Sequence, residues 1–201
     1  MQEIKLTVAN RIEALQKAIE VLKSGGTIIY PTETSYGLGC DFYNKKALEL
    51  IYKIKHRDNN KPLPVIVPDI TAATYLVDFK DEARKLALEY WPGPLTLVLP
   101  FKYCKWQGHC DEYLALRVSS HPFASDLVCS FGHPIVSTSA NISQGGDSYN
   151  PKKIKEQFSE EKFKPDLFIN AGVLAVHPPS TIVKFDGEVK VLRQGEIKIK
   201  L

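Results

Sequence analysis

The strongest constraint on the fold is an alternation along the chain between helical segments and short apolar strands. Apolar residues recur at helical spacing in residues 8–24 and 45–55. A short run rich in β-branched or aromatic residues follows each segment, at residues 27–30 and 64–67. Because strands that alternate with helices pair in a sheet covered by those helices, the pattern predicts an α/β fold.

Further elements are expected in the rest of the chain. The same periodicities predict helices at residues 81–90, 122–130 and 151–158 and strands at residues 95–99, 113–118, 134–138, 167–170, 181–185 and 189–193. The last two strands are joined through Asp186-Gly187, which is typical of a hairpin, so the sheet should be mixed. Since we find no linker, repeat or low-complexity tract, we expect residues 1–201 to form one domain.

Composition and charge argue against several classes of protein. With 26 Lys and Arg against 23 Asp and Glu, the net charge of +3 permits a local anion-binding patch but is small for a general nucleic-acid binder. Residues 1–17 carry charges throughout and so differ from a signal peptide. No stretch approaches the roughly 18 consecutive apolar residues of a membrane span. We therefore expect a cytoplasmic protein without membrane contact.

The cysteines predict free thiols rather than a disulfide framework. They are scattered through the chain, at Cys40, Cys104, Cys110 and Cys129. In a chain without an export signal, free thiols in a reducing compartment are expected. The segment CKWQGHC, residues 104–110, raises a zinc site as an alternative, but its spacing matches no CxxC knuckle and a second ligand pair is missing. A surface loop is the favoured interpretation.

Polar clusters interrupt the apolar elements at four places, each at or near the end of a strand or helix. They are Thr32–Thr34, Lys55–Arg57 with Lys61, Ser137–Asn141, and Ser180-Thr181 with Arg193. Solvated loops would be equally polar, but four such ends together favour a shared cleft, since strand ends build the sites of open α/β sheets. Lys and Arg suit phosphates, whereas hydroxyls and amides suit sugars, carboxylates and phosphate oxygens.

Common nucleotide-binding and nucleophile motifs are missing. The chain has no GxxxxGKS/T loop, and GLGCDF carries Phe42 where a dinucleotide-binding fingerprint needs its third glycine. It has no GxSxG elbow and no motif that places a cysteine beside a histidine. The residues by themselves therefore indicate a phosphate-binding α/β enzyme without a P-loop.

Several segments, covering nearly the whole chain, are similar to the motifs of one known family and occur in the same order. They are YPTETSYGLGCD, KHRDNNKPLPVIV, WPGPLTLVL, LALRVSSHPFASDLV, PIVSTSANISQGG, STIVKF and VKVLRQG. On these motifs the chain resembles the YrdC/Sua5 family of L-threonylcarbamoyladenylate synthases, in its short, single-domain YrdC-type form.

The resemblance implies a fold and a reaction. The fold is a YrdC-like twisted mixed sheet with flanking helices around a concave, positively lined cavity. The reaction converts L-threonine, bicarbonate and ATP into threonylcarbamoyl-AMP and pyrophosphate, with Mg²⁺ as cofactor held mainly through the ATP phosphates. The product would feed the transferase machinery that makes the t6A modification of tRNA, and a direct contact with tRNA is left open.

Carried over by position, the resemblance also implies roles for individual residues. The ATP-binding residues are Lys55, Arg57, Lys61, Ser139, Asn141 and Arg193, with Lys55 and Arg57 also catalytic, and the threonine-binding residues are Thr32, Arg117, Ser137 and Ser180. No residue is assigned as a metal ligand. Glu33 is either a general base or a carboxylate paired to a neighbouring cation, and the second interpretation is favoured.

Two other functions stay open on the sequence. An RNA-binding module would use the same basic cavity, but the small net charge and the lack of an aromatic-basic RNP-like stretch argue against it. A YciO-like paralogue would share the fold and carry out other chemistry. The intact KxR, Lys61 and SAN motifs favour the synthase.

Overall fold

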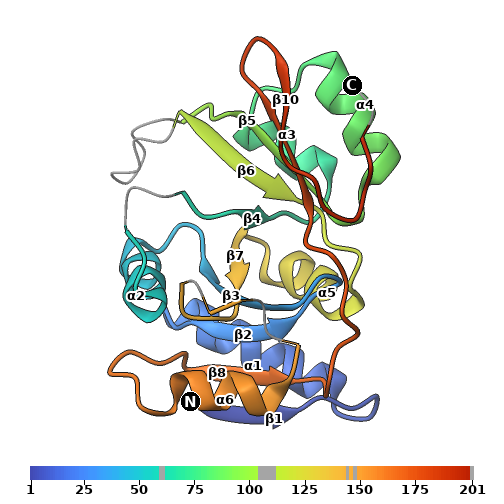
Figure 1. The fold of residues 1–201 in the computed structure, drawn as a ribbon. Helices are drawn as coiled ribbons and strands as arrows, with labels where there is room; N and C mark the ends of the chain where they lie inside the picture. The colour runs from blue at the N-terminus through green and yellow to red at the C-terminus, as the bar shows by residue number, and fades with distance from the viewer. Residues whose placement is uncertain (59–61, 104–111, 144, 147–148, 200–201) are drawn as a thin grey trace.

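The computed structural model describes residues 1–58, 62–103, 112–143, 145–146 and 149–199 (Figure 1). Its helices are α1 (Arg11–Lys23), α2 (Lys45–Lys55), α3 (Ile70–Leu76), α4 (Asp81–Tyr90), α5 (Pro122–Phe131) and α6 (Pro151–Ser159). Its strands are β1 (Gln2–Lys5), β2 (Ile28–Pro31), β3 (Tyr36–Asp41), β4 (Val65–Ile66), β5 (Leu95–Pro100), β6 (Tyr113–Arg117), β7 (Ile135–Ser139), β8 (Leu167–Asn170), β9 (Thr181–Phe185) and β10 (Val189–Arg193). The α/β class expected from the sequence is confirmed.

The named strands form one mixed sheet in two halves. Its order is β1-β8-β2-β3-β7-β4-β6-β5-β9-β10. We call β1, β8, β2, β3 and β7 the five-strand half, and β6, β5, β9 and β10 the four-strand half. Between them lies β4, which pairs antiparallel with β7 and parallel with β6 (Figure 1). Among the described residues, no helix is both long and apolar enough to cross a bilayer.

Helix α1 begins at Arg11 and buries the later part of the predicted apolar face, together with two alanines that the sequence analysis did not single out. The predicted apolar face started with Val8 and Ile12, but these residues are 98% and 73% exposed. Leu22 is buried as predicted, in a cluster with Ala14, Ala18 and residues of β2 and α5, and Leu15 and Ile19 pack partly buried against that cluster. The start of the predicted face was wrong, and the alanines were missed because alanine, a small residue, contributes little to an apolar pattern yet lets a helix approach its neighbours closely.

Strand β3 was not predicted, and neither were β1 and α3. Glycine is depleted in strands, and β3 contains Gly37 and Gly39. The backbone of Gly39 lies against its neighbours, since an added Cβ would be 2.5 Å from the Val136 carbonyl oxygen and 3.0 Å from Tyr30 Cε1. The glycines therefore let the Tyr30 ring and strand β7 approach the β3 backbone.

The register of β3 brings two of the polar clusters together. In its antiparallel pairing with β7, Gly37 lies opposite Ser139 and Gly39 opposite Ser137. On the other side, β2 pairs with β3 up to Pro31 and Tyr36, so the turn that follows Pro31 lies at the same end of the sheet as Ser139. Residues about 100 positions apart in the chain thus meet near the middle of the sheet.

We predict that Gly39→Ala lowers the free energy of unfolding by about 1–3 kcal/mol, because the new methyl group would overlap a backbone carbonyl that cannot move freely. Gly37→Ala is the matched control. Its Cβ would meet only side chains, at 3.2 Å or more, and should cost less. Urea denaturation of both variants measures the difference, and equal midpoints would contradict the close approach of β7 to Gly39.

Candidate active site

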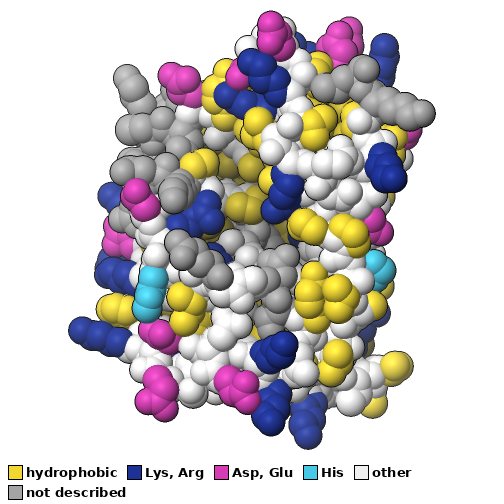
Figure 2. Space-filling model, in the orientation of Figure 1, with side chains coloured by type: hydrophobic (Ala, Val, Ile, Leu, Met, Phe, Trp, Pro, Cys, Tyr) yellow, Lys and Arg dark blue, Asp and Glu magenta, His cyan; other side chains and the backbone are white. Residues whose placement is uncertain are grey.

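A cavity of about 400 Å³ lies between the two halves of the sheet. Figure 2 shows this face of the molecule hollowed, with Lys and Arg side chains at the border of the hollow. Its lining includes seven predicted site residues: Thr32, Arg57, Arg117, Ser137, Ser139, Ser180 and Arg193. Among the lining residues that the structure describes, three are arginines and none is acidic. The concave, positively lined cavity expected from the resemblance is therefore present.

The Thr32 hydroxyl organises the turn that follows β2. It donates to the Ser35 carbonyl oxygen at 2.6 Å and accepts from the backbone N–H groups of Thr34 and Ser35, each at 3.3 Å. Such side-chain contacts replace the ladder hydrogen bonds that the chain loses where a strand ends. Thr32 and Thr34 both line the cavity.

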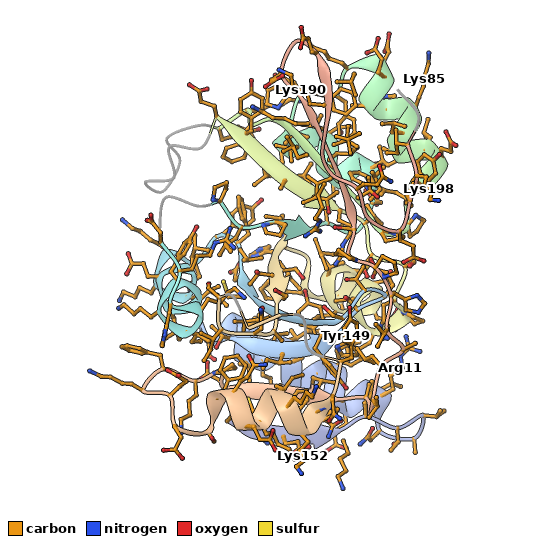
Figure 3. All side chains as sticks on the ribbon, viewed as in Figure 1. Arg11, Lys85, Tyr149, Lys152, Lys190 and Lys198 are labelled. Atoms are coloured by element: carbon orange, nitrogen blue, oxygen red, sulfur yellow. The ribbon has the colours of Figure 1, made fainter. Side chains whose placement is uncertain are left out.

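Tyr36 connects this wall of the cavity to the segment between β8 and β9. Its hydroxyl donates to the Gly172 carbonyl oxygen at 2.7 Å and accepts from the Ala171 N–H at 2.9 Å. Burial raises the pKa of Tyr36 to about 12, so the hydroxyl stays protonated and can donate. Tyr149 holds the same segment further along, where its hydroxyl donates to the His177 carbonyl oxygen at 2.9 Å (Figure 3).

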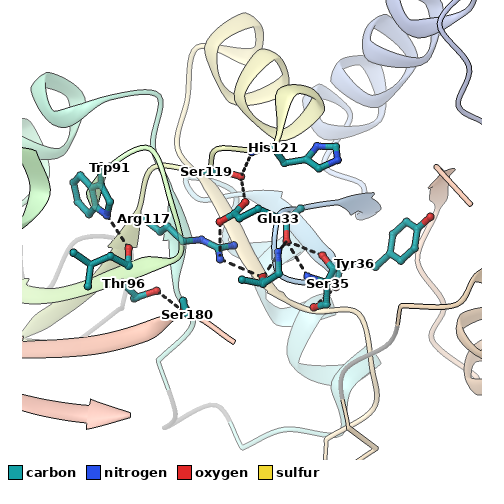
Figure 4. A network of polar contacts seen from close by, with 12 residues as sticks. Glu33, Ser35, Tyr36, Trp91, Thr96, Arg117, Ser119, His121 and Ser180 are labelled. Atoms are coloured by element: carbon teal, nitrogen blue, oxygen red, sulfur yellow. Dashed lines mark hydrogen bonds and ion pairs between the residues drawn. The ribbon is translucent and has the colours of Figure 1, made fainter. Parts of the chain in front are cut away.

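Arg117 enters the cavity from the end of β6, and the loop after β2 contacts its guanidinium. Arg117 Nη1 lies 3.0 Å from Glu33 Oε1 and donates to Thr34 Oγ1 at 3.3 Å. The Ser119 hydroxyl donates to the other Glu33 oxygen (Figure 4). Glu33 is therefore paired to a neighbouring cation, which is the interpretation that the sequence favoured.

The four-strand half contributes a second polar group to the cavity. Arg193 donates through Nε and Nη2 to the Ser180 carbonyl oxygen, at 3.0 and 2.9 Å, and Nη2 also donates to the Ser180 hydroxyl at 3.0 Å. The Thr96 hydroxyl lies 2.9 Å from the Ser180 hydroxyl (Figure 4). These contacts fix Ser180 at the start of β9, with its hydroxyl between Thr96 and Arg193.

Lys55 lies buried and outside the cavity lining, beside the Ser139–Asn141 turn. Its ammonium group donates to the carbonyl oxygens of Ser139 and Asn141, at 2.7 and 2.8 Å, and to Asn141 Oδ1 at 3.0 Å. Lys55 is 2% exposed and, like Asn141, is not among the residues that line the cavity. An ammonium group has three N–H donors, and here each has an oxygen acceptor. Lys55 thus holds the Ser139–Asn141 turn, and its predicted contact with phosphate stays a prediction.

Arg57 faces the cavity although it lies only two residues from the buried Lys55. His56 separates them, with a φ of 49° that reverses the chain direction after α2. Arg57 Nη2 donates to the Pro62 carbonyl oxygen at 3.0 Å, and Arg57 Nε is buried with no hydrogen-bond partner among the described residues. Lys61 lies outside the described residues, so its contact with ATP stays a prediction.

No metal site is found in the part of the chain that the structure describes. There, no three or more His, Cys, Asp or Glu residues are grouped so as to hold a metal ion. The segment considered for zinc, residues 104–110, lies outside that part. Cys40 and Cys129 are free thiols, the first buried and the second exposed.

Several polar residues of the site were missed by the sequence analysis. Thr96 lies within an otherwise apolar strand, LTLVL, and its side chain is 4% exposed. Thr96 and Val98 both line the cavity, which is the two-residue spacing of one strand face. Its position two residues from Val98, on the same face of the strand, is the feature of the sequence that could have identified Thr96 as a site residue. Ser119 had no comparable signal, because only the fold places it beside Glu33.

Comparison with known proteins places the chain in a family. The model of the Sua5/YciO/YrdC family, described as telomere recombination, matches residues 20–195. The chain belongs to the Sua5/YciO/YrdC family. This agrees with the resemblance drawn from the motifs.

Curated relatives named threonylcarbamoyl-AMP synthase are similar over most of the chain. The protein of Methylococcus capsulatus is 37% identical over 147 residues, which cover 72% of this chain and 79% of the relative. The protein of Photorhabdus laumondii is 34% identical over 153 residues, which cover 74% of this chain and 81% of the relative.

Solved structures share the fold. The structure of P. abyssi Sua5 complexed with L-threonine matches with a TM-score of 0.86 at 27% identity over 96% of this chain, and this chain spans 57% of that protein. E. coli YciO matches with a TM-score of 0.80 at 26% identity, over 96% of this chain and 93% of the other.

We predict that Lys55→Met lowers the free energy of unfolding by about 2 kcal/mol or more, because three oxygens of the Ser139–Asn141 turn lose a charged donor and, among the described residues, Asn141 Oδ1 keeps only the Ser139 hydroxyl. Lys46→Met is the matched control. Lys46 lies exposed on the same helix, and its replacement should change stability by less than about 0.5 kcal/mol. Urea denaturation without ligands measures both. A Lys55→Met variant as stable as the control would show that the ammonium does not hold the turn.

Proposed function

We propose that this protein is an ATP-dependent threonylcarbamoyl-AMP synthase that uses L-threonine, bicarbonate and ATP. The observation that carries the proposal is the cavity itself, which combines arginines with hydroxyl groups and has no acidic residue among its described lining. Such a surface suits the anionic groups of these substrates, which are the threonine carboxylate and the ATP phosphates. The curated relatives named threonylcarbamoyl-AMP synthase support the choice of reaction.

The amino-acid end of the site lies around Arg117. A guanidinium group recognises a carboxylate through two parallel hydrogen bonds, and Arg117 lines the cavity beside Thr32 and Ser137. Ser180 lines the same cavity from the four-strand half. We assign the threonine carboxylate to Arg117 and the threonine hydroxyl and amino group to the hydroxyl-bearing residues. The likeness to P. abyssi Sua5, whose structure is a complex with L-threonine, supports threonine as the ligand.

The nucleotide end lies toward Arg57 and Arg193. Both are cavity-lining cations, Arg57 Nε lacks a partner among the described residues, and Ser139 lines the same cavity. We assign the phosphates to Arg57, together with Lys61, and the adenylate to Arg193. Mg²⁺ would be held by the ATP phosphates, since the described lining offers no carboxylate, and it would offset their negative charge.

The chemistry needs positioning and charge stabilisation rather than a protein nucleophile. The threonine amine takes up CO₂ from bicarbonate and becomes a carbamate, with loss of water. A carbamate oxygen then attacks the α-phosphorus of ATP, and the bond to pyrophosphate breaks. Negative charge builds up on the phosphoryl oxygens and on the leaving pyrophosphate, so fixed cations such as Arg57 supply the stabilisation.

The product would be consumed by an enzyme that transfers the threonylcarbamoyl group to tRNA. A cytoplasmic location, the t6A transferase machinery as downstream partner and a direct contact with tRNA stay predictions. Figure 3 places the labelled Arg11, Lys85, Lys152, Lys190 and Lys198 around the outside of both halves.

The likeness to E. coli YciO is consistent with the alternative of a YciO-like paralogue with another activity, but no observation favours that alternative over the synthase. Both candidates share the fold, so they must be separated by activity.

The decisive experiment incubates the protein with labelled ATP, Mg²⁺, bicarbonate and L-threonine and measures pyrophosphate and threonylcarbamoyl-AMP. We expect pyrophosphate release to depend on threonine. L-Serine is the control substrate, and loss of one methyl group from an enclosed side chain should make it about 10- to 200-fold less efficient. Pyrophosphate release that does not depend on an amino acid, or no release at all, would refute the proposed function.

A further inference from the structure

Glu33 and Arg117 form an ion pair that is largely removed from water. The side chains are 13% and 11% exposed, and Glu33 Oε1 lies 3.0 Å from Arg117 Nη1. At this burial the attraction is screened little by salt. The two residues come from different elements, the turn after β2 and the end of β6, so the pair also fixes these elements relative to each other.

The Glu33 carboxylate has a second anchor in the short segment between β6 and α5. Its other oxygen accepts from the Ser119 hydroxyl, and Ser119 Oγ accepts in turn from the His121 N–H at 3.3 Å (Figure 4). His121 Nδ1 accepts from the Phe123 N–H at 3.2 Å and thereby caps α5. Burial lowers the pKa of His121, which keeps the ring neutral and able to accept. Glu33 is thus held from two sides.

These contacts use only one edge of the Arg117 guanidinium. Nη1 contacts Glu33 and Thr34, while among the described residues no side chain or backbone oxygen is bonded to Arg117 Nη2 or Nε. A guanidinium group carries five N–H donors in one plane. Because Nη1 is fixed, the orientation of the remaining donors is fixed as well, and Arg117 lines the cavity.

We propose that Glu33 is a positioning residue, which holds Arg117 so that its remaining donors meet the carboxylate of the amino-acid substrate. The inference rests on the proposed function and deepens it. Glu33 is not among the residues that line the cavity, and its two oxygens face Arg117, in an ion pair, and Ser119, in a hydrogen bond, so we assign it no role in accepting the proton of the threonine amine. A general base must lie within hydrogen-bond reach of the proton that it removes.

The test compares Glu33→Gln with the wild-type protein. Glutamine keeps the size of the side chain and can still contact Ser119, but it removes the charge that holds Arg117. We expect the KM for threonine to rise about tenfold or more, with the KM for ATP and the kcat at saturating threonine changed by less than about threefold. A general base would give the opposite pattern, with kcat lowered about 10²- to 10⁴-fold, and that result would overturn the proposal.

A double-mutant cycle shows whether Glu33 acts through Arg117. In an Arg117→Ala background, Glu33→Gln should have no further effect on the KM for threonine, because the group that it positions is gone. An equal effect in both backgrounds would mean that Glu33 acts on the substrate independently. Glu160→Gln, at an exposed position, is the matched control for the loss of one negative charge.

Two further measurements separate a failure of the positioning role of Glu33 from a failure of the proposed function. Glu33→Asp keeps the charge at a shorter reach, so its KM for threonine should lie between those of the wild-type protein and Glu33→Gln. If the Gln variant fails to fold, a raised KM for threonine in Glu33→Asp, with kcat changed by less than about threefold, tests the role on its own. Direct titration of threonine by calorimetry measures binding without turnover. If the wild-type protein binds threonine but releases no pyrophosphate, the proposed function fails while the role of Glu33 is still tested. If Glu33→Asp and Glu33→Gln both bind threonine as tightly as the wild-type protein, the positioning role is refuted.

Discussion

The site depends first on the antiparallel pairing of β3 with β7. Strand β3 can lie against β7 and under the Tyr30 ring because two of its residues are glycines, and the pairing sets Gly37 opposite Ser139. A slip by one residue would turn every side chain of the strand to the other face of the sheet. The Thr32 turn and the Ser139–Asn141 turn would then no longer lie side by side.

The buried charges of the site divide into two kinds. Lys55 has three oxygen acceptors within the protein and supports the turn that carries Ser139. Arg117 is paired with Glu33 on one edge only and reaches the cavity with the rest of its guanidinium. Burying a charge is costly unless hydrogen bonds compensate for it. For Lys55 the compensating hydrogen bonds all come from oxygens of the protein. Among the described residues, Arg117 has a protein carboxylate on Nη1 only, so its other donors can bind the carboxylate of a substrate.

Much of the fold could be predicted from periodicity, but contacts between distant residues could not. The segments at 45–55, 181–185 and 189–193 have clear patterns and form α2, β9 and β10. Strand β3 has a composition that argues against a strand, and its existence depends on β2 and β7, which lie beside it. The site residues drawn from the family motifs fall largely on one cavity. The burial of Lys55 arises from tertiary structure and carries no mark in the sequence. For Glu33 the sequence favoured a cation as partner, but only the fold shows that this cation is Arg117.

The most direct test of this account is an experimental structure of the protein with L-threonine bound. We predict that the threonine carboxylate lies within hydrogen-bond distance of Arg117 Nη2 and Nε, while Arg117 Nη1 keeps its contact with Glu33. Threonine bound outside the cavity, or bound inside it with its carboxylate away from Arg117, would contradict the account.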